Sequence, residues 1–500
     1  MNIQAQQQAA AGQEQTHFDV LIVGAGISGI DAAYHLQRDM PGKSFALLDK
    51  QSSFGGTWHV HRYPGIRSDS DLYTFGYSWK PWMGTPIATA DEILRYLGEA
   101  IEEQDLARHI RYGQLVRAAA WDGETALWTL TVEDRETGVT RPMTCSFLWM
   151  CQGYYRHDEG YIPDYPGQAR FGGDIIHPQT WPEDLDYSGK RVVVIGSGAT
   201  AATVVPAMAG TAEHVTMLQR SPTYFFARPN TSELAELLKP LGLPDEWFHE
   251  IMRRKYLYDG EVTARRSREE PDSLRNDLLA GAKAYLGEDY PIDPHFTPTY
   301  RPWRQRLALI PDGDLYKAIR SGTASVATDR IETFTETGIQ LASGEHLDAD
   351  IIVSATGFDM SPLGDILFTV DGAMLDFSQC WAHRGILFSG LPNLAWMFGY
   401  LRTSWTMRAD LIAEFVIRLL RHMEANGARS VTPTLRERDR DMAPLPLISE
   451  ENFNAGYIQR SMHLMPRQGD RPPWVFSQDY YTEKDEIAGA DLEDGTLIFK

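Results

Sequence analysis

Residues 18–29 read FDVLIVGAGISG, in which a largely apolar run ends in three glycines spaced as G-x-G-x-x-G. The apolar run predicts a buried strand, and the residues after Gly29 predict a helix that ends at Pro41-Gly42. A second apolar run at 44–48 leads to the acidic residue Asp49. Strand, glycine turn, helix, strand and acidic residue in this order are typical of a βαβ dinucleotide-binding unit.

The residue types of this first motif suit the chemistry of a dinucleotide. Gly24 allows a tight strand-to-helix turn, Gly26 lets the backbone approach a pyrophosphate, and Gly29 permits close helix packing. A carboxylate at Asp49 accepts hydrogen bonds from ribose hydroxyls and repels a 2′-phosphate. The first unit is therefore predicted to bind FAD or NAD. For the glycines alone, a glycine-rich turn without a ligand is the alternative.

A second unit of the same kind begins at the strand 191–195 and differs at the residue that selects the cofactor. Its turn reads Gly196-Ser197-Gly198-Ala199-Thr200-Ala201, and the strand 215–220 ends in Arg220, which Ser221 follows. An arginine at this place suits the 2′-phosphate of NADPH. The alternative is that Arg220 is a solvated charge at a strand end. The chain is thus predicted to hold two nucleotides, the second of them NADPH.

The fold class expected from these units is α/β, with two Rossmann-like dinucleotide-binding domains and a helical insertion in the second. Residues 232–300 are rich in Leu, Glu, Arg and Pro with helical spacing, which indicates the insertion. The expected segments are a disordered tail at 1–16, the FAD-binding domain at 17–160 and 376–500, the NADPH-binding domain at 161–223 and 302–375, and the helical insertion at 224–301.

Composition excludes several other classes of protein. The formal net charge of −21 disfavours nucleic acid as a partner. Three cysteines without a CxxC pair indicate neither a disulfide framework nor a thiol redox centre, and they fit a cytoplasmic protein. No window has the uninterrupted apolar length of a transmembrane helix. No residue pattern indicates a metal site, and the sequence leaves the oligomeric state open.

Two further motifs carry a family resemblance. Residues 171–182 read FGGDIIHPQTWP and match FxGxxxHxxxWP at every specified position, and residues 55–69 contain Gly55-Gly56-Thr57-Trp58 followed by Tyr63-Pro64-Gly65 and Asp69. With both glycine motifs, the chain resembles the type I Baeyer-Villiger monooxygenases, which are class B flavoprotein monooxygenases. The wording of residues 62–71 and 196–201 is most similar to the branch that contains the ethionamide-activating monooxygenase. The resemblance runs from about residue 18 to 357 and on toward 402.

The resemblance implies contacts for individual residues. Those implied for FAD are Ser28, Asp49, Gly56, Thr57, Trp58, His59, Val60, Asp69 and Val116. Those implied for NADPH are Arg67, Ser68, Asp69, Gly196, Ser197, Gly198, Ala199, Thr200, Ala201, Ala202, Arg220 and Ser221. His177 and Trp181 belong to a linker between the domains and are interpreted as structural.

The resemblance also implies a catalytic pair, Arg306 and Asp69. Arg306 follows Pro302-Trp303-Arg304-Gln305, where relatives have an acidic residue in place of Arg304. An arginine cannot lose its proton, so Arg306 would stabilise a C4a-peroxyflavin in its deprotonated form while Asp69 orients it. The alternative is that Arg301, Arg304 and Arg306 form a solvated basic face.

The predicted function is an FAD- and NADPH-dependent enzyme that converts ketones to esters or lactones with O2, with sulfoxidation as a side activity. One alternative is a flavin enzyme restricted to nitrogen or sulfur oxygenation, which would need neither Asp69 nor Arg306. A second alternative is a non-catalytic redox-sensing flavoprotein, which would not need an NADPH site. The partners expected are O2 and a small ketone or sulfide, whose identity the sequence leaves open.

Overall fold

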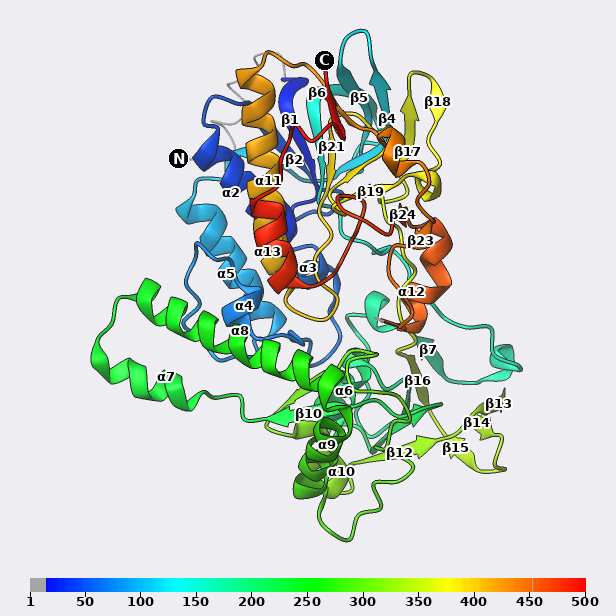
Figure 1. Cartoon of the computed structure of the whole chain (residues 1–500). Helices are drawn as coiled ribbons and strands as arrows, with labels where there is room; N and C mark the ends of the chain where they lie inside the picture. Colours follow the sequence, from blue (N-terminus) through cyan, green and yellow to red (C-terminus); the bar gives the residue numbers. More distant parts are fainter. Residues whose placement is uncertain (1–14, 452) are drawn as a thin grey trace, which may run out of the picture.

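The computed structural model describes residues 15–451 and 453–500. Of the tail expected at 1–16, all but Gln15 and Thr16 lies outside the described residues. The chain forms two lobes, each built around its own sheet, with the first lobe at the top of Figure 1 and the second below it.

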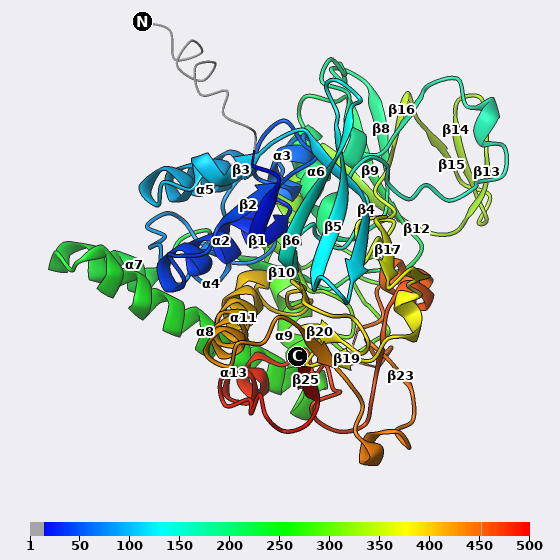
Figure 2. The ribbon, with the colours of Figure 1, turned by 90° about the horizontal axis from the view of Figure 1, so that it is seen from above.

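The sheet of the first lobe has the strand order β18-β17-β4-β5-β6-β1-β2-β3, and β21 also pairs with β6. Figure 2 shows most of these strands side by side. The strands are β1 (His17–Val23), β2 (Phe45–Leu48), β3 (Ile110–Arg111), β4 (Gln114–Asp122), β5 (Leu127–Asp134), β6 (Thr140–Met150), β17 (Leu367–Val370), β18 (Ala373–Met374) and β21 (Leu394–Trp396). The helices of this lobe are α2 (Ile27–Asp39), α3 (Thr57–Val60), α4 (Leu72–Phe75), α5 (Ala90–Glu103) and α11 (Trp405–Ala425).

β1 has a continuous apolar run because its side chains pack into two separate hydrophobic cores. Val20 and Ile22 pack into one core with α2 and α11, while Phe18, Leu21 and Val23 pack into another on the opposite face. A strand buried on both faces has apolar residues at successive positions rather than at every second one. β1 therefore lies inside the sheet, paired in parallel with β2 and β6.

The chain returns to the first sheet at β17, before residue 376, where the second part of the FAD-binding domain was expected to begin. β17 pairs in parallel with β4, with Leu367 opposite Ala118, although residues 302–375 were assigned to the second nucleotide domain. Phe368 is buried in the core beside β4. The strand has only four residues and gives no periodic signal of its own, so its sheet could not be read from the sequence.

The second lobe contains a five-stranded sheet with the order β12-β9-β8-β16-β7, in which every pair is parallel. Its strands are β7 (Asp174–Ile176), β8 (Arg191–Ile195), β9 (His214–Gln219), β12 (Ala324–Thr328) and β16 (Ile351–Ser354), with helices α6 (Ala199–Met208) and α10 (Asp314–Arg320). Smaller sheets are formed by β10 (Phe225–Arg228) with β11 (Ala308–Pro311) and by β13 (Ile331–Phe334), β14 (Gly338–Leu341) and β15 (His346–Asp348). The predicted α/β class with two Rossmann-like units is confirmed.

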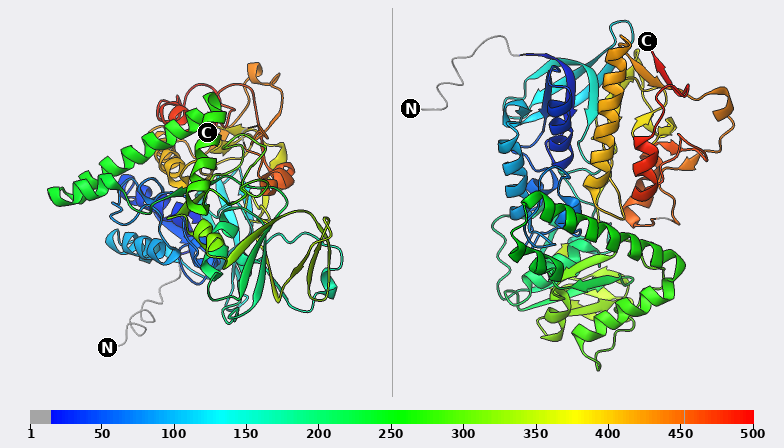
Figure 3. Two further views of the ribbon diagram at one scale, coloured as in Figure 1. Left: turned by 90° about the horizontal axis from the view of Figure 1, so that it is seen from below. Right: turned by 60° about the vertical axis from the view of Figure 1, so that its left-hand side comes forward.

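Three helices lie between β10 and β11 in the chain: α7 (Glu233–Leu238), α8 (Asp245–Glu269) and α9 (Pro271–Leu286). α9 packs into the core of the second lobe through Ala282 and Leu286, whereas Phe248 and Met252 of α8 belong to a core of the first lobe. The insertion therefore joins the two lobes, and the right panel of Figure 3 shows α8 lying across their junction.

The C-terminal part of the chain packs on the first lobe. It contains the short strands β19 (Ala382–His383), β20 (Leu387–Phe388), β22 (Val431–Pro433), β23 (Leu445–Pro446), β24 (Arg467–Gln468) and β25 (Leu497–Phe499), and the helices α12 (Gly456–Ser461) and α13 (Tyr480–Ala488). A fully buried ion pair between Arg408 Nε and Glu483 Oε2, 2.7 Å long, holds α13 against α11. Among the helices of the described residues, we find none with the length and apolar content that crossing a bilayer requires.

Candidate active site

The first glycine turn is shaped by close backbone approaches. Gly24 has φ +108°, and a Cβ atom there would lie 2.5 Å from the carbonyl oxygen of Cys151. A Cβ atom on Gly29 would lie 1.9 Å from the carbonyl oxygen of Gly24, so α2 packs directly on the turn. The helix begins after Gly26, which has no side chain to cap its first N–H groups. These N–H groups, at the positive end of the helix dipole, suit a phosphate.

Asp49 stabilises this turn through two hydrogen bonds with backbone N–H groups. Its Oδ2 accepts a hydrogen bond from Ala25 N at 2.6 Å, and its Oδ1 accepts one from Gln51 N at 2.8 Å. Burial raises the pKa of Asp49, and the two N–H donors oppose that rise. Each carboxylate oxygen has a second lone pair, so a ribose contact remains compatible with this bracing role.

The second glycine turn repeats the geometry of the first. Gly196 has φ +131°, and a Cβ atom there would lie 2.4 Å from the carbonyl oxygen of Ala355. α6 begins after Gly198, again without a side-chain cap. Ser197 Oγ lies 2.8 Å from Thr223 Oγ1, which fixes the turn against the segment after β9. Arg220 is exposed and lies beside this turn.

A cavity of about 600 Å³ runs past both turns. Of the residues expected to contact a cofactor, the following line it: Gly24, Gly26, Ser28, Asp49, Gly56, Thr57, Trp58, Arg67, Ser68, Asp69, Gly196, Ser197, Gly198, Ala199, Thr200 and Arg220. The glycine turns and the uncapped helix starts fit two nucleotide phosphates, and the cavity connects them. The structure thus brings together most of the residues that the sequence singled out from two distant motifs.

Seven expected contact residues lie outside this lining, namely Gly29, His59, Val60, Val116, Ala201, Ala202 and Ser221. Gly29 holds α2 against the turn, and Ala201 and Ala202 face the core beneath α6. Val116 points into the core of the first sheet and is 4% exposed. For these residues, a contact with a cofactor stays a prediction that the lining of the cavity does not support.

Arg306 and Asp69 meet in this cavity. Arg306 Nη2 donates to Asp69 Oδ1 at 2.8 Å and to Ser70 Oγ at 2.9 Å, and Arg306 Nε forms an ion pair with Asp69 Oδ2. Arg306 Nη1 donates to the carbonyl oxygen of Leu401 at 2.6 Å. The guanidinium is therefore fixed on three sides in a plane that the protein sets.

The electrostatics keep Arg306 charged. Burial acts to lower the pKa of Arg306, but the neighbouring carboxylate of Asp69 outweighs it, so the pKa lies above its usual range. The three arginines of the segment do not form one solvated face, because Arg301 Nη1 instead donates to the carbonyl oxygen of Ser267 at 2.8 Å. Arg304 is half-buried and contributes its backbone carbonyl to Asn454 N.

Aromatic side chains that the sequence analysis did not single out surround this point. Tyr154, Trp405 and Tyr457 line the cavity, and Trp405 Nε1 donates to Ser28 Oγ at 2.8 Å. Burial raises the pKa of Tyr457 well above its usual range, so its hydroxyl keeps its proton beside Arg306. Tyr154 comes from an irregular segment, Trp405 from the start of α11 and Tyr457 from the short helix α12, and neither spacing nor a motif marks them.

His177 and Trp181 of the 171–182 motif make structural contacts within the second lobe. His177 Nε2 lies 3.1 Å from the carbonyl oxygen of Gly357, while its Nδ1 accepts from Gln179 N at 3.1 Å. Burial lowers the pKa of His177, so the ring is neutral and donates through Nε2. Trp181 packs against the core of the second lobe. This geometry agrees with the structural interpretation of both residues.

Residues 63–67 connect the two lobes. Arg67 Nη1 donates to Asp314 Oδ2 at 2.5 Å, and Asp314 is the first residue of α10 in the second lobe. A Cβ atom on Gly65 would lie 2.6 Å from the Cβ atom of Ala207 in α6. The loop that carries Arg67, Ser68 and Asp69 is therefore seated directly on the second lobe.

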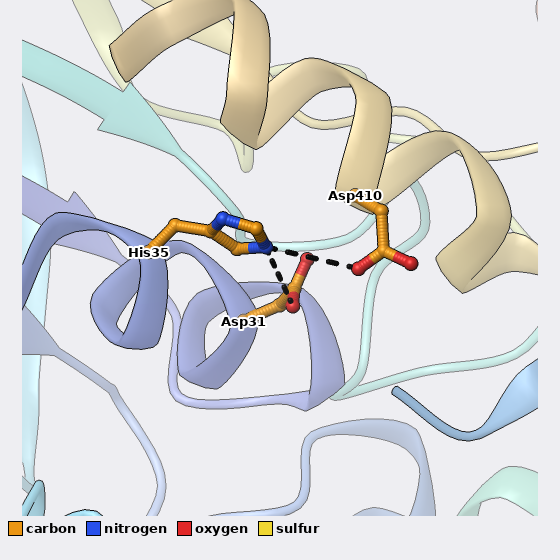
Figure 4. A group of neighbouring side chains, drawn as sticks. All are labelled: Asp31, His35 and Asp410. Atoms are coloured by element: carbon orange, nitrogen blue, oxygen red, sulfur yellow. Dashed lines mark ion pairs between the residues drawn. The ribbon is translucent and has the colours of Figure 1, made fainter. Parts of the chain in front are cut away.

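Outside this cavity, Asp31, His35 and Asp410 form a buried polar cluster between α2 and α11 (Figure 4). His35 Nε2 lies 3.7 Å from Asp31 Oδ1 and 3.8 Å from Asp410 Oδ1. Because Arg38 Nη2, which can only donate, lies 3.2 Å from His35 Nδ1, the ring proton belongs on Nε2 between the carboxylates. A protonated nitrogen does not ligate a metal, so we interpret the cluster as a contact between helices.

This architecture, with two nucleotide-binding lobes and one shared cavity, defines a flavoprotein of the two-dinucleotide-domain class. The family model described as NAD(P)-binding Rossmann-like domain matches residues 22–83, and the model described as flavin-binding monooxygenase-like matches residues 86–234. In fold, the chain is similar to cyclohexanone monooxygenase from Rhodococcus sp. Phi1 bound to NADP+, with a TM-score of 0.75 at 22% identity over 97% of this chain and 100% of that one.

Two relatives are similar over nearly the whole chain. The putative FAD-containing monooxygenase MymA of Mycobacterium tuberculosis is 44% identical over 488 residues, which are 97% of each protein. The FAD-containing monooxygenase EthA of Mycolicibacterium smegmatis is 44% identical over 485 residues, also 97% of each. The chain belongs to this family of FAD-containing monooxygenases. The prediction of a flavin monooxygenase of the ethionamide-activating branch is confirmed.

Proposed function

We propose that the protein is a Baeyer-Villiger monooxygenase that uses FAD and NADPH. In the net reaction a ketone, O2, NADPH and a proton give an ester or lactone, NADP+ and water. The observation that carries the proposal is the position of Arg306, which is fixed by Asp69 where the cavity of the two glycine turns meets a second cavity. The cyclohexanone monooxygenase of matching fold is named for a ketone and was solved with NADP+, which supports both parts of the proposal.

We propose that each glycine turn binds one of the two cofactors. The Gly24–Gly29 turn and Asp49 would hold FAD, and the Gly196–Ala201 turn with Arg220 would hold NADPH. When bound, FAD would supply the acceptance of hydride from NADPH and the activation of O2 that make one oxygen atom available for transfer. Arg220 offers charge-assisted hydrogen bonds to a 2′-phosphate, which NADH lacks.

Arg306 supplies a permanent positive charge at the point of oxygen transfer. Negative charge develops on the ketone oxygen when its carbonyl carbon is attacked, and a fixed guanidinium stabilises that charge without having to reorganise. Asp69 and the carbonyl of Leu401 hold the guanidinium plane in place. The side chains of Tyr154, Trp405 and Tyr457 line this cavity and would help to keep water away from the reacting atoms.

We also propose sulfoxidation as a side activity, since a thioether small enough to enter the same cavity meets the same oxidant. The cytoplasm is the proposed location, which the three free and buried cysteines support. An enzyme restricted to nitrogen or sulfur would have no use for the anion-stabilising pair Arg306 and Asp69.

The test is product analysis with purified holoenzyme, NADPH and O2. Phenylacetone or a 2-alkanone should be converted to the corresponding ester, with NADPH consumed in proportion, and a thioether should give the sulfoxide more slowly. Sulfoxide without any ester from a panel of ketones would favour the alternative of a heteroatom oxygenase. NADPH consumption that no substrate accelerates would contradict the proposal altogether.

A further inference from the structure

A second cavity, of about 210 Å³, adjoins the first at Asp69 and Arg306. It extends from there along one face of α8 toward Arg268 and Arg402. Apolar and aromatic side chains also line this cavity, among them Leu257, Trp303, Leu307 and Tyr480. A molecule that reaches Arg306 through this cavity would thus place its other end beside a second basic group.

Of the arginines in this cavity wall besides Arg306, Arg228 is exposed and stacks on Phe226, Arg268 is exposed, and Arg402 is half-buried. Within residues 15–451 and 453–500, its guanidinium makes neither a hydrogen bond nor an ion pair, although it is half-buried in the cavity wall. Burial lowers the pKa of Arg402, and the positive charge of Arg268 lowers it further. An arginine in such a place gains from an anion that arrives with a ligand.

Among the described residues, no acidic residue of the cavity wall forms a hydrogen bond or ion pair with Arg402, although the charge of Asp479 acts to raise the pKa of Arg402. Asp479 accepts from Tyr481 N at 3.0 Å as the cap of α13, and Asp259 forms an ion pair with Lys255. Asp71 accepts from Thr74 Oγ1 at 2.9 Å, and burial raises the pKa of Asp71 to about 6. Asp69 is bound by Arg306, and Glu261 acts electrostatically on Tyr481. These contacts leave the guanidinium of Arg402 available to a ligand.

We propose that the second cavity binds a ketone whose far end carries a carboxylate, and that Arg402 holds this carboxylate. A guanidinium presents two parallel N–H donors that match the two oxygens of a carboxylate. The apolar side chains of the same cavity would accommodate the carbon chain, and Arg306 would face the carbonyl group. This inference rests on the proposed function for the carbonyl end, whereas the carboxylate end rests on Arg402 alone.

Binding is measured first, because it does not depend on turnover. The oxidised holoenzyme with NADP+ is titrated by calorimetry with a medium-chain methyl-ketone acid and with its methyl ester. The acid should bind at least tenfold more tightly than the ester, because charge-assisted hydrogen bonds are lost with the charge. Arg402→Gln should remove this difference and leave binding of the ester within about twofold. Arg265→Gln, an exposed arginine of α8 outside the cavity wall, is the control and should change neither.

Turnover then separates this inference from the proposed function. Arg402→Gln should lower kcat/KM for the acid roughly 10- to 100-fold and leave that for the ester nearly unchanged. Equal affinity of the wild-type protein for acid and ester would overturn the inference without any variant. So would an equal loss for both ligands in Arg402→Gln. Tight, Arg402-dependent binding of an acid that is never oxygenated would uphold the carboxylate site and contradict the proposed function instead.

Discussion

Arg306 and Arg220 are proposed to act at different steps of the reaction, so each can be tested by the step that it affects. Arg306 contacts Asp69, Ser70 and Leu401 and lies outside both glycine turns. Its loss should therefore spare cofactor binding and affect oxygen transfer, whereas the loss of Arg220 should affect the choice of the reduced nucleotide.

For Arg306→Ala we expect almost complete loss of ester formation with normal FAD content, because the charge developing on the ketone oxygen is no longer stabilised. NADPH oxidation should continue at a lower rate, with its electrons recovered as H2O2. Arg306→Lys should not restore ester formation, since an ammonium lacks the planar fork that Asp69 holds. Arg304→Ala is the matched control. Ester formed by Arg306→Ala at near the wild-type rate would remove this residue from the mechanism.

Arg220→Ala should raise the KM for NADPH roughly ten- to a hundredfold, because each charge-assisted bond to the 2′-phosphate contributes about 1.5–3 kcal/mol. NADH serves as the internal control, as it lacks that phosphate, and its KM should change little. Steady-state kinetics with both nucleotides measure the effect. An equal rise for NADPH and NADH would show that Arg220 is structural.

Residue patterns differ in how much of the site they could predict. The turn around Gly24 is local, because strand, glycines and helix lie within a few residues, and its position followed from spacing alone. The contact between Arg306 and Asp69 joins positions 237 apart and came only from the family resemblance. Trp405 and Tyr457 could not be found, since an isolated aromatic residue reads the same in a core and in a cavity wall.

At the scale of elements, α2 and α11 meet through the buried cluster of Asp31, His35 and Asp410 (Figure 4). Burial, and after it the nearby carboxylate of Asp410, raise the pKa of Asp31 from 3.8 to about 7. Between pH 4 and 7 the unfolded chain releases this proton while the folded protein keeps it. The contribution of Asp31 to stability therefore falls as pH rises through this window.

Asp31→Asn should raise the melting temperature by several degrees at pH 8 and by much less at pH 5, because the amide carries no charge to bury. The control is Asp39→Asn on the same helix, where the partner Arg38 lowers the pKa of the carboxyl, so that its neutralisation should not stabilise the protein at pH 8. Thermal unfolding at both pH values measures the two variants. A gain of equal size at pH 5 and pH 8 would disprove the ionisation argument.

Some helices and strands could be predicted from sequence patterns, and others could not. The buried strands β1 and β8 and the uncapped helices after them were predictable, since their apolar runs are long and the glycines mark the turns. β17 was not, because a four-residue strand gains its place from pairing with β4 rather than from its own composition. The insertion was recognised as helical, but nothing in its spacing showed that α8 packs on the opposite lobe.

At the scale of the whole molecule, the two lobes must keep a fixed relative position if one cavity is to bind both nucleotides. Arg67 from the first lobe and Asp314 from α10 of the second form an ion pair whose side chains are 14% and 29% exposed. Asp314 lines neither cavity, so its effect on function would pass through Arg67.

Asp314→Asn should therefore raise the KM for NADPH several-fold and increase the share of electrons lost as H2O2, with FAD content unchanged. Asp289→Asn, an exposed carboxylate of the same lobe, is the control. In a double-mutant cycle with Arg67→Gln, the two losses should be clearly less than additive. Full additivity would show that the pair does not act as a unit.

The whole account depends on the transfer of one oxygen atom from O2 into a ketone. This is measured by incubating the holoenzyme with NADPH and phenylacetone under 18O2 and analysing the ester by mass spectrometry. The account predicts an ester that carries one 18O atom, formed in proportion to the NADPH consumed. An ester without 18O, or NADPH consumption that yields H2O2 and unchanged ketone in the wild-type protein, would contradict it.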